Sequence, residues 1–286
     1  MRRLKIKHTT TYEYSEAVQL QPHKLLLRPR EGHDIRIDAS QLEIFPAHRI
    51  KWQRDVYGNS VGVVTFTEPG NTLSIVSEVW LQHYEDRPLD FLVADYAVNF
   101  PFHYDPEERV DLAPYLLSVY FSEDRAPLNQ WLAQFWQPNQ RPETYVLLDY
   151  INKAIANGFI YQMREEPGVQ TPAKTLTTQS GSCRDYAALF IEACRHLGLA
   201  ARFVSGYLHC PATEQGHGST HAWSEVYLPG AGWKGFDSTT GQVVGSDHIA
   251  VAVHRHPRAV PPVSGAFIAK FQQSPMMTVA VQVAEI

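Results

Sequence analysis

Residues 181–200 read GSCRDYAALFIEACRHLGLA. Their apolar side chains recur at helical spacing, and Gly198 is a typical helix stop signal. Ser182 stands where the first turn of such a helix needs an N-cap. We therefore expect a helix that begins after Ser182, ends near Gly198 and packs one apolar face against a core.

Cys183 falls in the first turn of this expected helix, between polar neighbours. Unpaired backbone N–H groups and the positive end of the helix dipole meet there, and both favour the reactive thiolate over the thiol. Cys194, by contrast, lies on the apolar stripe, and Cys210 lies in a loop before a proline. We predict that Cys183 is a nucleophile and that the other two cysteines are unreactive thiols.

A base for this nucleophile is expected further along the chain. His221 opens the alternating stretch HAWSEVYL, and Asp237 lies in the following stretch, GWKGFDST. Two antiparallel strands joined by LPGAGW would place Asp237 beside His221, where a carboxylate can orient the imidazole and stabilise its charged form. The alternative for Asp237 is a turn cap before Ser238, so the prediction rests on the three residues together.

The chain as a whole predicts an α+β fold. Residues 1–85 read as short antiparallel strands of a β-sandwich, and residues 86–142 as a connecting segment with short helices. Residues 143–286 read as a catalytic domain, in which a helix within PETYVLLDYINKAIANGF, residues 142–159, and the Cys183 helix pack on a sheet with a last strand over 276–286.

Composition narrows the classes of function. The chain has 286 residues and a formal net charge of −5 without a long run of like charge, which gives no indication of a nucleic-acid or membrane partner. No apolar stretch follows the early arginines, and no segment approaches a membrane span. Three cysteines without a secretion signal favour reduced thiols in the cytoplasm. Nothing indicates an oligomeric state.

These motifs together strongly resemble the transglutaminase-like superfamily of cysteine enzymes. The resemblance covers the Cys, His and Asp motifs in order, SGY at 205–207 and HIAVAV at 248–253. LLLRPREG and DVYGNSV resemble the β-rich domain that precedes this core in bacterial members. One departure is HRHPRAVPPVSGAF, where His256-Pro257 replaces an Asp-Tyr pair, which affects substrate contacts on that loop and leaves the three central residues intact.

The resemblance implies a papain-like core with Cys183 as nucleophile, His221 as base and Asp237 as the orienting acid. It implies attack on an amide of a peptide or protein substrate and a thioester resolved by water or by a second amine, with the Cys183 backbone N–H as one oxyanion donor. We expect hydrolysis, because water is always present and nothing in the sequence indicates an amine pocket. Gln179 and Tyr161 are candidates for the second donor. Acyl transfer to an amine, as in a transglutaminase, and a catalytically inactive binding module remain alternatives.

Two further groups were weighed. His209, Cys210, His217 and His221 crowd together, but their spacing fits no usual zinc pattern, so we expect neither metal nor cofactor. The aromatic residues Tyr207, Trp223 and Trp233 flank the expected site, where they could line a substrate groove or pack in the core.

Overall fold

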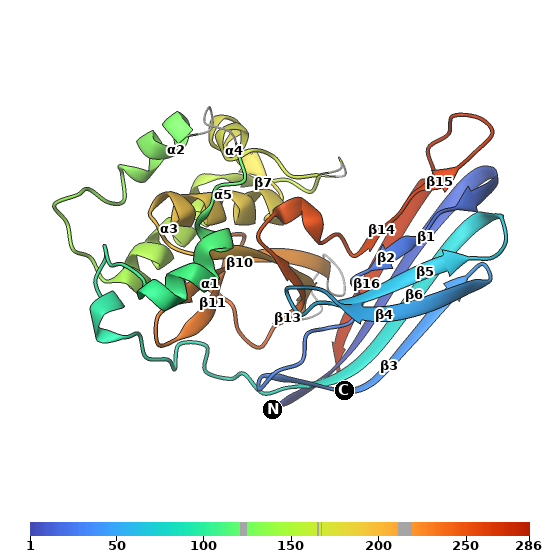
Figure 1. Cartoon of the computed structure of the whole chain (residues 1–286), viewed down its shortest axis with the longest axis horizontal. Helices are drawn as coiled ribbons and strands as arrows, with labels where there is room; N and C mark the ends of the chain where they lie inside the picture. The colour runs from blue at the N-terminus through green and yellow to red at the C-terminus, as the bar shows by residue number, and fades with distance from the viewer. Residues whose placement is uncertain (121–124, 165, 167, 211–218) are drawn as a thin grey trace.

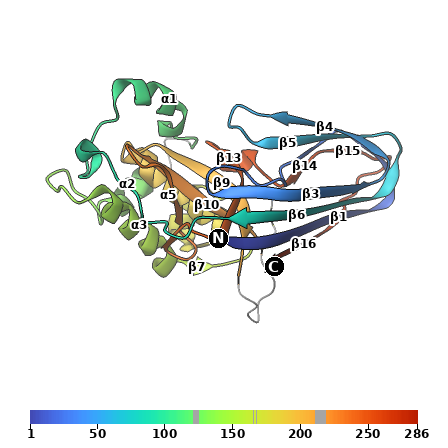
Figure 2. The ribbon, with the colours of Figure 1, turned by 90° about the horizontal axis from the view of Figure 1, so that it is seen from below.

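The computed structural model describes residues 1–120, 125–164, 166, 168–210 and 219–286. A β-rich part and a mixed part of helices and sheet lie side by side (Figure 1). Figure 2 shows the long strands of the β-rich part extending away from the mixed part. The predicted α+β class is confirmed.

The β-rich part consists of two facing antiparallel sheets. The first has the order β15-β1-β6-β3, with β16 also pairing with β1, and the second has the order β14-β2-β5-β4. Apolar side chains such as Leu25, Val64 and Ile75 are buried in one cluster of this part, as expected for a sandwich. The bounds of its strands are β1 Arg2–Leu20, β2 His23–Leu25, β3 Ile35–Phe45, β4 His48–Arg54, β5 Ser60–Phe66, β6 Gly70–His83, β14 Val263–Ser264, β15 Phe267–Ile268 and β16 Met276–Glu285.

The last three of these strands correct the predicted domain boundary. β16 runs antiparallel to β1, from the pair Leu4–Glu285 to the pair Glu13–Met276, and β14 pairs with β2. Residues 263–285 therefore belong to the β-rich part, and the prediction that they belong to a catalytic domain of residues 143–286 is wrong. Alternation along a sequence identifies a strand but not its partner, and here the partner lies at the far end of the chain.

The mixed part packs helices on one antiparallel sheet of order β12-β11-β10-β9-β13. Helix α5 contacts β10 and β9, and the Ser224 hydroxyl donates a hydrogen bond to the Ala187 carbonyl of α5 at 3.0 Å. The predicted helix, hairpin and following strand are all confirmed. The bounds are α3 Thr144–Gly158, α5 Cys183–His196, β9 Ala201–Leu208, β10 Ser219–Leu228, β11 Gly232–Asp237, β12 Gln242–Val243 and β13 His248–His254.

Short elements complete this part. The connecting segment packs its aromatic residues on the helices, with the rings of Phe100 and Trp136 at 5.0 Å. Among the described residues, no helix is long and apolar enough to span a bilayer. The remaining bounds are η1 Asp95–Ala97, α1 Pro106–Leu116, α2 Arg125–Leu132, β7 Ile160–Tyr161, α4 Pro172–Thr178, β8 Ser180–Gly181 and η3 Pro257–Ala259.

The β-rich part covers the edge of the sheet of the mixed part at β13. The fully buried Asn59 side chain accepts from the Val253 backbone N–H at 2.9 Å and donates to the Val253 carbonyl at 2.8 Å, as a neighbouring strand would. The Arg30 backbone N–H donates to the Ala250 carbonyl at 2.8 Å. Both residues on β13 thereby obtain partners that a lone edge strand would lack.

Candidate active site

The start of helix α5 is held rigidly around Cys183. Asp185 accepts hydrogen bonds from the backbone N–H of Ser182 at 2.9 Å and from its hydroxyl at 2.8 Å. Its carboxylate also pairs with Arg164 at 2.7 Å and accepts from the Gln170 backbone N–H at 2.8 Å. Burial opposes the Asp185 charge, but these donors outweigh burial and lower the Asp185 pKa. Cys183 is thus the first residue of a firmly capped helix, as predicted.

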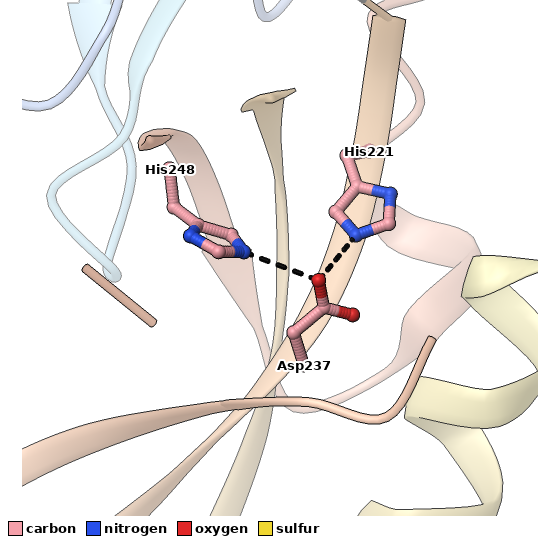
Figure 3. Close-up of side chains that lie close together, drawn as sticks. All are labelled: His221, Asp237 and His248. Carbon is pink, nitrogen blue, oxygen red and sulfur yellow. Dashed lines mark hydrogen bonds and ion pairs between the residues drawn. The ribbon is translucent and has the colours of Figure 1, made fainter. Parts of the chain in front are cut away.

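His221 and Asp237 meet across the neighbouring strands β10 and β11. The antiparallel register pairs Ser224 with Phe236, which brings Asp237 toward the start of β10. His221 Nε2 lies 2.9 Å from Asp237 Oδ2 (Figure 3). Asp237 is fully buried and His221 is 7% exposed, so water screens their interaction poorly. The predicted neighbourhood of these two residues is confirmed.

Cys183 and Tyr161 complete the cluster. Burial disfavours a charged imidazole, but hydrogen bonds with Asp237 and Cys183 outweigh it and raise the pKa of His221 to about 10. Because His221 Nε2 contacts Asp237, Nδ1 is the ring nitrogen that remains for an interaction with the Cys183 thiol. Burial, and then the charge and hydrogen bond of Cys183, raise the pKa of Tyr161 to about 12. Its hydroxyl therefore keeps its proton beside the sulfur.

A second histidine that the sequence did not single out also contacts Asp237. His248 Nε2 lies 3.2 Å from Asp237 Oδ2, opposite His221 (Figure 3). The Thr239 backbone N–H donates to the other carboxylate oxygen at 2.9 Å. Burial opposes the charge, but the two imidazoles hold the pKa of Asp237 well below its usual range. The available signal was that His248, like His221, opens an alternating strand.

His221, Asp237 and His248 are residue types that can also hold a metal ion. Ligand atoms of His221, Asp237 and His248 lie within 4.8 Å of one another. However, His248 Nδ1 accepts a hydrogen bond from the Gly245 backbone N–H at 3.4 Å, which leaves the ring hydrogen on Nε2. A metal ligand must present a bare nitrogen, so this arrangement suits donation to a carboxylate better than coordination.

The histidines and cysteines that are close in sequence between residues 209 and 221 do not share one site among the described residues. His209 Nδ1 lies 2.9 Å from Arg2 and 3.3 Å from Asp247, while His221 turns to Asp237. Cys210 is half-buried, and His217 lies outside the described residues. The two described histidines of this group thus have other partners.

The three predicted groove aromatics occupy different places. Tyr207 is buried against the β-rich part, with its hydroxyl 3.0 Å from His8 Nδ1, so of the two expected places it takes the core and not a substrate groove. Trp223 is buried and packs edge-on against the His248 ring at 5.2 Å. Trp233 stacks on Arg202, whose guanidinium carbon Cζ lies 4.1 Å from the centre of the ring. The alternation of apolar residues along β9 does not show which face of the strand, and hence whether Tyr207, packs against the β-rich part.

Trp223 and Trp233 line a cavity. Cys183 is not among the described residues that line it. This cavity has a volume of about 470 Å³ and lies between residues 30–35 of the β-rich part and strands β10 to β12. His248 also lines it. The two tryptophans therefore line a cavity shared with His248 and not a groove lined by Cys183.

The two candidate oxyanion donors lie at the short parallel pair of strands β7 and β8, which precedes Cys183. Tyr161 ends β7, whose parallel partner β8 leads directly into Cys183. Gln179 has a left-handed backbone, with φ of 47°, and its carbonyl accepts from the Ile160 N–H at 2.8 Å. Of these two candidates, Tyr161 is the one whose pKa is raised by the neighbouring Cys183, after burial.

Family comparisons agree with the resemblance expected from the motifs. Residues 131–238 match the transglutaminase-like superfamily, and residues 4–82 match the bacterial transglutaminase-like N-terminal region. The uncharacterized protein Rv2569c of Mycobacterium tuberculosis is 29% identical over 298 residues, covering 95% of this chain and 90% of its own length. The uncharacterized protein ML0607 of Mycobacterium leprae is 23% identical, covering 93% and 94%.

One solved structure shares the whole architecture. A protein of Cytophaga hutchinsonii, provisionally described as a cysteine protease, superposes with a TM-score of 0.75 at 20% identity. The match covers 100% of this chain and 91% of that chain. At this identity the likeness shows the fold, in which the β-rich and mixed parts occur together.

Proposed function

We propose that the protein is a cysteine hydrolase that cleaves amide bonds of peptide or protein substrates, because residues 131–238 match the transglutaminase-like superfamily. The observation that carries this proposal is the pair of His221 and Asp237, in which a buried carboxylate lies 2.9 Å from an imidazole. Burial opposes the charge of this imidazole, but Asp237 and then Cys183 outweigh burial and raise the pKa of His221. Such a chain of groups is what thiol activation requires.

In the acylation step, Cys183 Sγ forms a bond to the amide carbon as a thiolate. The carbonyl π electrons move to oxygen, and the resulting oxyanion is stabilised by the Cys183 backbone N–H and the Tyr161 hydroxyl. His221, charged through its raised pKa, transfers its Nδ1 proton to the leaving nitrogen. The C–N bond breaks, an amine departs and a thioester remains.

In the deacylation step, His221 accepts a proton from water, which attacks the thioester carbon. The C–S bond breaks, a carboxylic acid leaves and the Cys183 thiolate returns beside the charged imidazole. Asp237 remains ionised and keeps its hydrogen bond to Nε2 throughout. An amine in place of water would give transglutaminase chemistry from the same thioester.

Alkylation by iodoacetamide tests the proposal without a known substrate. We expect Cys183 to react at neutral pH and to slow at least about tenfold in His221→Ala, since a hydrogen bond to a charged group is worth ~1.5–3 kcal/mol. Cys194, fully buried on α5, is the internal control. Labelling of Cys183 no faster than of Cys194 in the native protein would exclude the nucleophile.

The nature of the acceptor is tested separately. β-Casein incubated with a fluorescent primary amine should show new peptide ends or released amine without bound fluorescence if water resolves the thioester. Fluorescence attached to casein, and lost in Cys183→Ala, would indicate acyl transfer instead. Loss of both activities with intact Cys183 alkylation would favour the inactive binding module.

The three free cysteines support placing the protein in the cytoplasm. Fractionation of cells that express it tests this placement, and recovery outside the cytoplasm would contradict it.

A further inference from the structure

His248 touches the proposed reaction centre, yet the steps above give it no role. Its Nδ1 accepts from the Gly245 backbone N–H, so its ring hydrogen lies on Nε2 and points to Asp237 Oδ2 at 3.2 Å. Figure 3 shows the two imidazoles on opposite sides of this one oxygen. In this arrangement His248 serves Asp237 only as a hydrogen-bond donor.

Asp237 needs such a donor because it is ionised without contact with water. One of its oxygens accepts from both histidines, and the other accepts from the Thr239 backbone N–H at 2.9 Å. An ionised carboxylate in the interior is stable only while its lone pairs have partners. Without His248, the charge becomes harder to maintain and Oδ2 loses the second contact that fixes its direction toward His221.

His248 is itself fixed from the β-rich part. His83, the last residue of β6, lies with Nε2 3.1 Å from the backbone carbonyl oxygen of His248. The Glu85 backbone N–H donates to Nδ1 of His83 at 3.3 Å, so Nε2 is the donor to that carbonyl. The Trp223 ring packs against the imidazole from the catalytic sheet. The donor therefore has little freedom to leave Asp237.

We propose that His248 is a positioning residue that holds the Asp237 carboxylate ionised and directed at His221, and that the β-rich part contributes to the reaction centre by fixing His248 through His83. This inference rests on the proposed function, because it concerns the same carboxylate. It gives the β-rich part a task at the site in addition to covering the sheet edge.

Several titratable groups face this cluster, and any pH profile reports on them together. Cys183 comes from α5 and Tyr161 from β7, while the remaining groups line the cavity that His248 also lines. Those groups are Arg30, Glu31, His33, Asp34, His83, Glu85, Arg202, Glu225 and Lys234.

Two substitutions separate the donor from the rest of the side chain. In His248→Gln the terminal amide reaches about as far as Nε2 and can still donate to Asp237. In His248→Asn the amide reaches only about as far as Nδ1, so the contact near Gly245 can persist while the donor is lost. The readout is the rate of Cys183 alkylation by iodoacetamide across pH, with thermal unfolding of each variant alongside.

We expect His248→Asn to slow alkylation at neutral pH about tenfold and to lower the pH at which His221 loses its proton, while His248→Gln stays close to the wild type. His83→Leu should change the rate in the direction of His248→Asn. Equal slowing in the Asn and Gln variants would mean that the donor is not what matters, and would overturn the inference.

Failure of the inference can be told from failure of the proposed function. If the wild type reacts rapidly, His221→Ala slowly and His248→Asn as fast as the wild type, the role of His248 is excluded while the nucleophile stands. If Cys183 of the wild type is no faster than Cys194, the proposed function itself fails. An unchanged rate in folded His83→Leu would overturn the part assigned to the β-rich part.

Discussion

The Asp237 carboxylate lies 2.9 Å from Nε2 of His221, and both residues are buried although they come from different strands. This contact directs the other ring nitrogen toward Cys183 and favours the charged imidazole. The hairpin of β10 and β11 is thus what turns a cysteine at a helix start into a candidate nucleophile.

Asp237→Asn removes the charge and keeps the shape of this contact. We expect Cys183 alkylation near neutral pH to fall at least about tenfold, because the imidazolium loses a buried counter-charge worth ~1.5–3 kcal/mol. The rate measurement uses iodoacetamide and mass spectrometry of the labelled peptide. Asp149→Asn, at a half-buried position of α3 where the carboxylate pairs with Lys153, is the matched control. A rate shared by both variants would contradict the role of Asp237.

Stability should depend on the charge of His221 in alkaline solution. The folded-state pKa of His221 is raised from 6.5 to about 10, so its contribution is complete below about 6.5 and is lost as pH rises through about 10. Urea unfolding of the wild type and His221→Gln over this range should show their difference in unfolding free energy shrinking with pH. A difference that grows with pH would reverse the sign and refute the assignment.

Asn59→Leu tests the contact that covers the sheet edge. The substitution leaves the buried N–H and carbonyl of Val253 without their partners, which should lower the free energy of unfolding by about 2–5 kcal/mol. Thermal and urea unfolding measure this loss. Asn71→Leu, at an exposed position of β6, is the control and should change stability little. Equal stabilities would show that the edge of β13 does not depend on Asn59.

Much of the site was predictable because its signals are local. Ser182 and Gly198 mark the ends of one helix, and the alternation around His221 together with the turn at Gly230 marks the hairpin that brings Asp237 alongside. Each of these patterns spans fewer than about 20 residues, so no distant partner had to be known.

The parts that were missed depend on contacts between distant segments. The alternation of β16 showed a strand, but only its pairing with β1 places it in the β-rich part. His248 stood at the start of a recognised strand, yet its direction toward Asp237 follows from the packing of Trp223 and the contact with His83. Tyr207 likewise took its place from the face of β9 that meets β1.

Arg164→Met tests how firmly the start of helix α5 must be held. Asp185 is fully buried, and Arg164 contributes its only cation among the described contacts, with N–O distances of 2.7 and 2.8 Å. Methionine keeps an apolar stem but leaves the carboxylate with its neutral donors from Ser182 and Gln170. Because those donors remain, we expect a loss of about 1–3 kcal/mol in unfolding free energy rather than the full cost of an unpaired charge.

This loss should depend on pH. The pKa of Asp185 is lowered in the wild type and should rise in the variant. The deficit in unfolding free energy of the variant relative to the wild type should therefore be smaller in mild acid than at neutral pH. Cys183 alkylation should slow as the first turn loosens. Arg87→Met, whose parent side chain is 76% exposed, is the control, and matching stability and alkylation rates in the two variants would show that the ion pair does not hold the nucleophile in place.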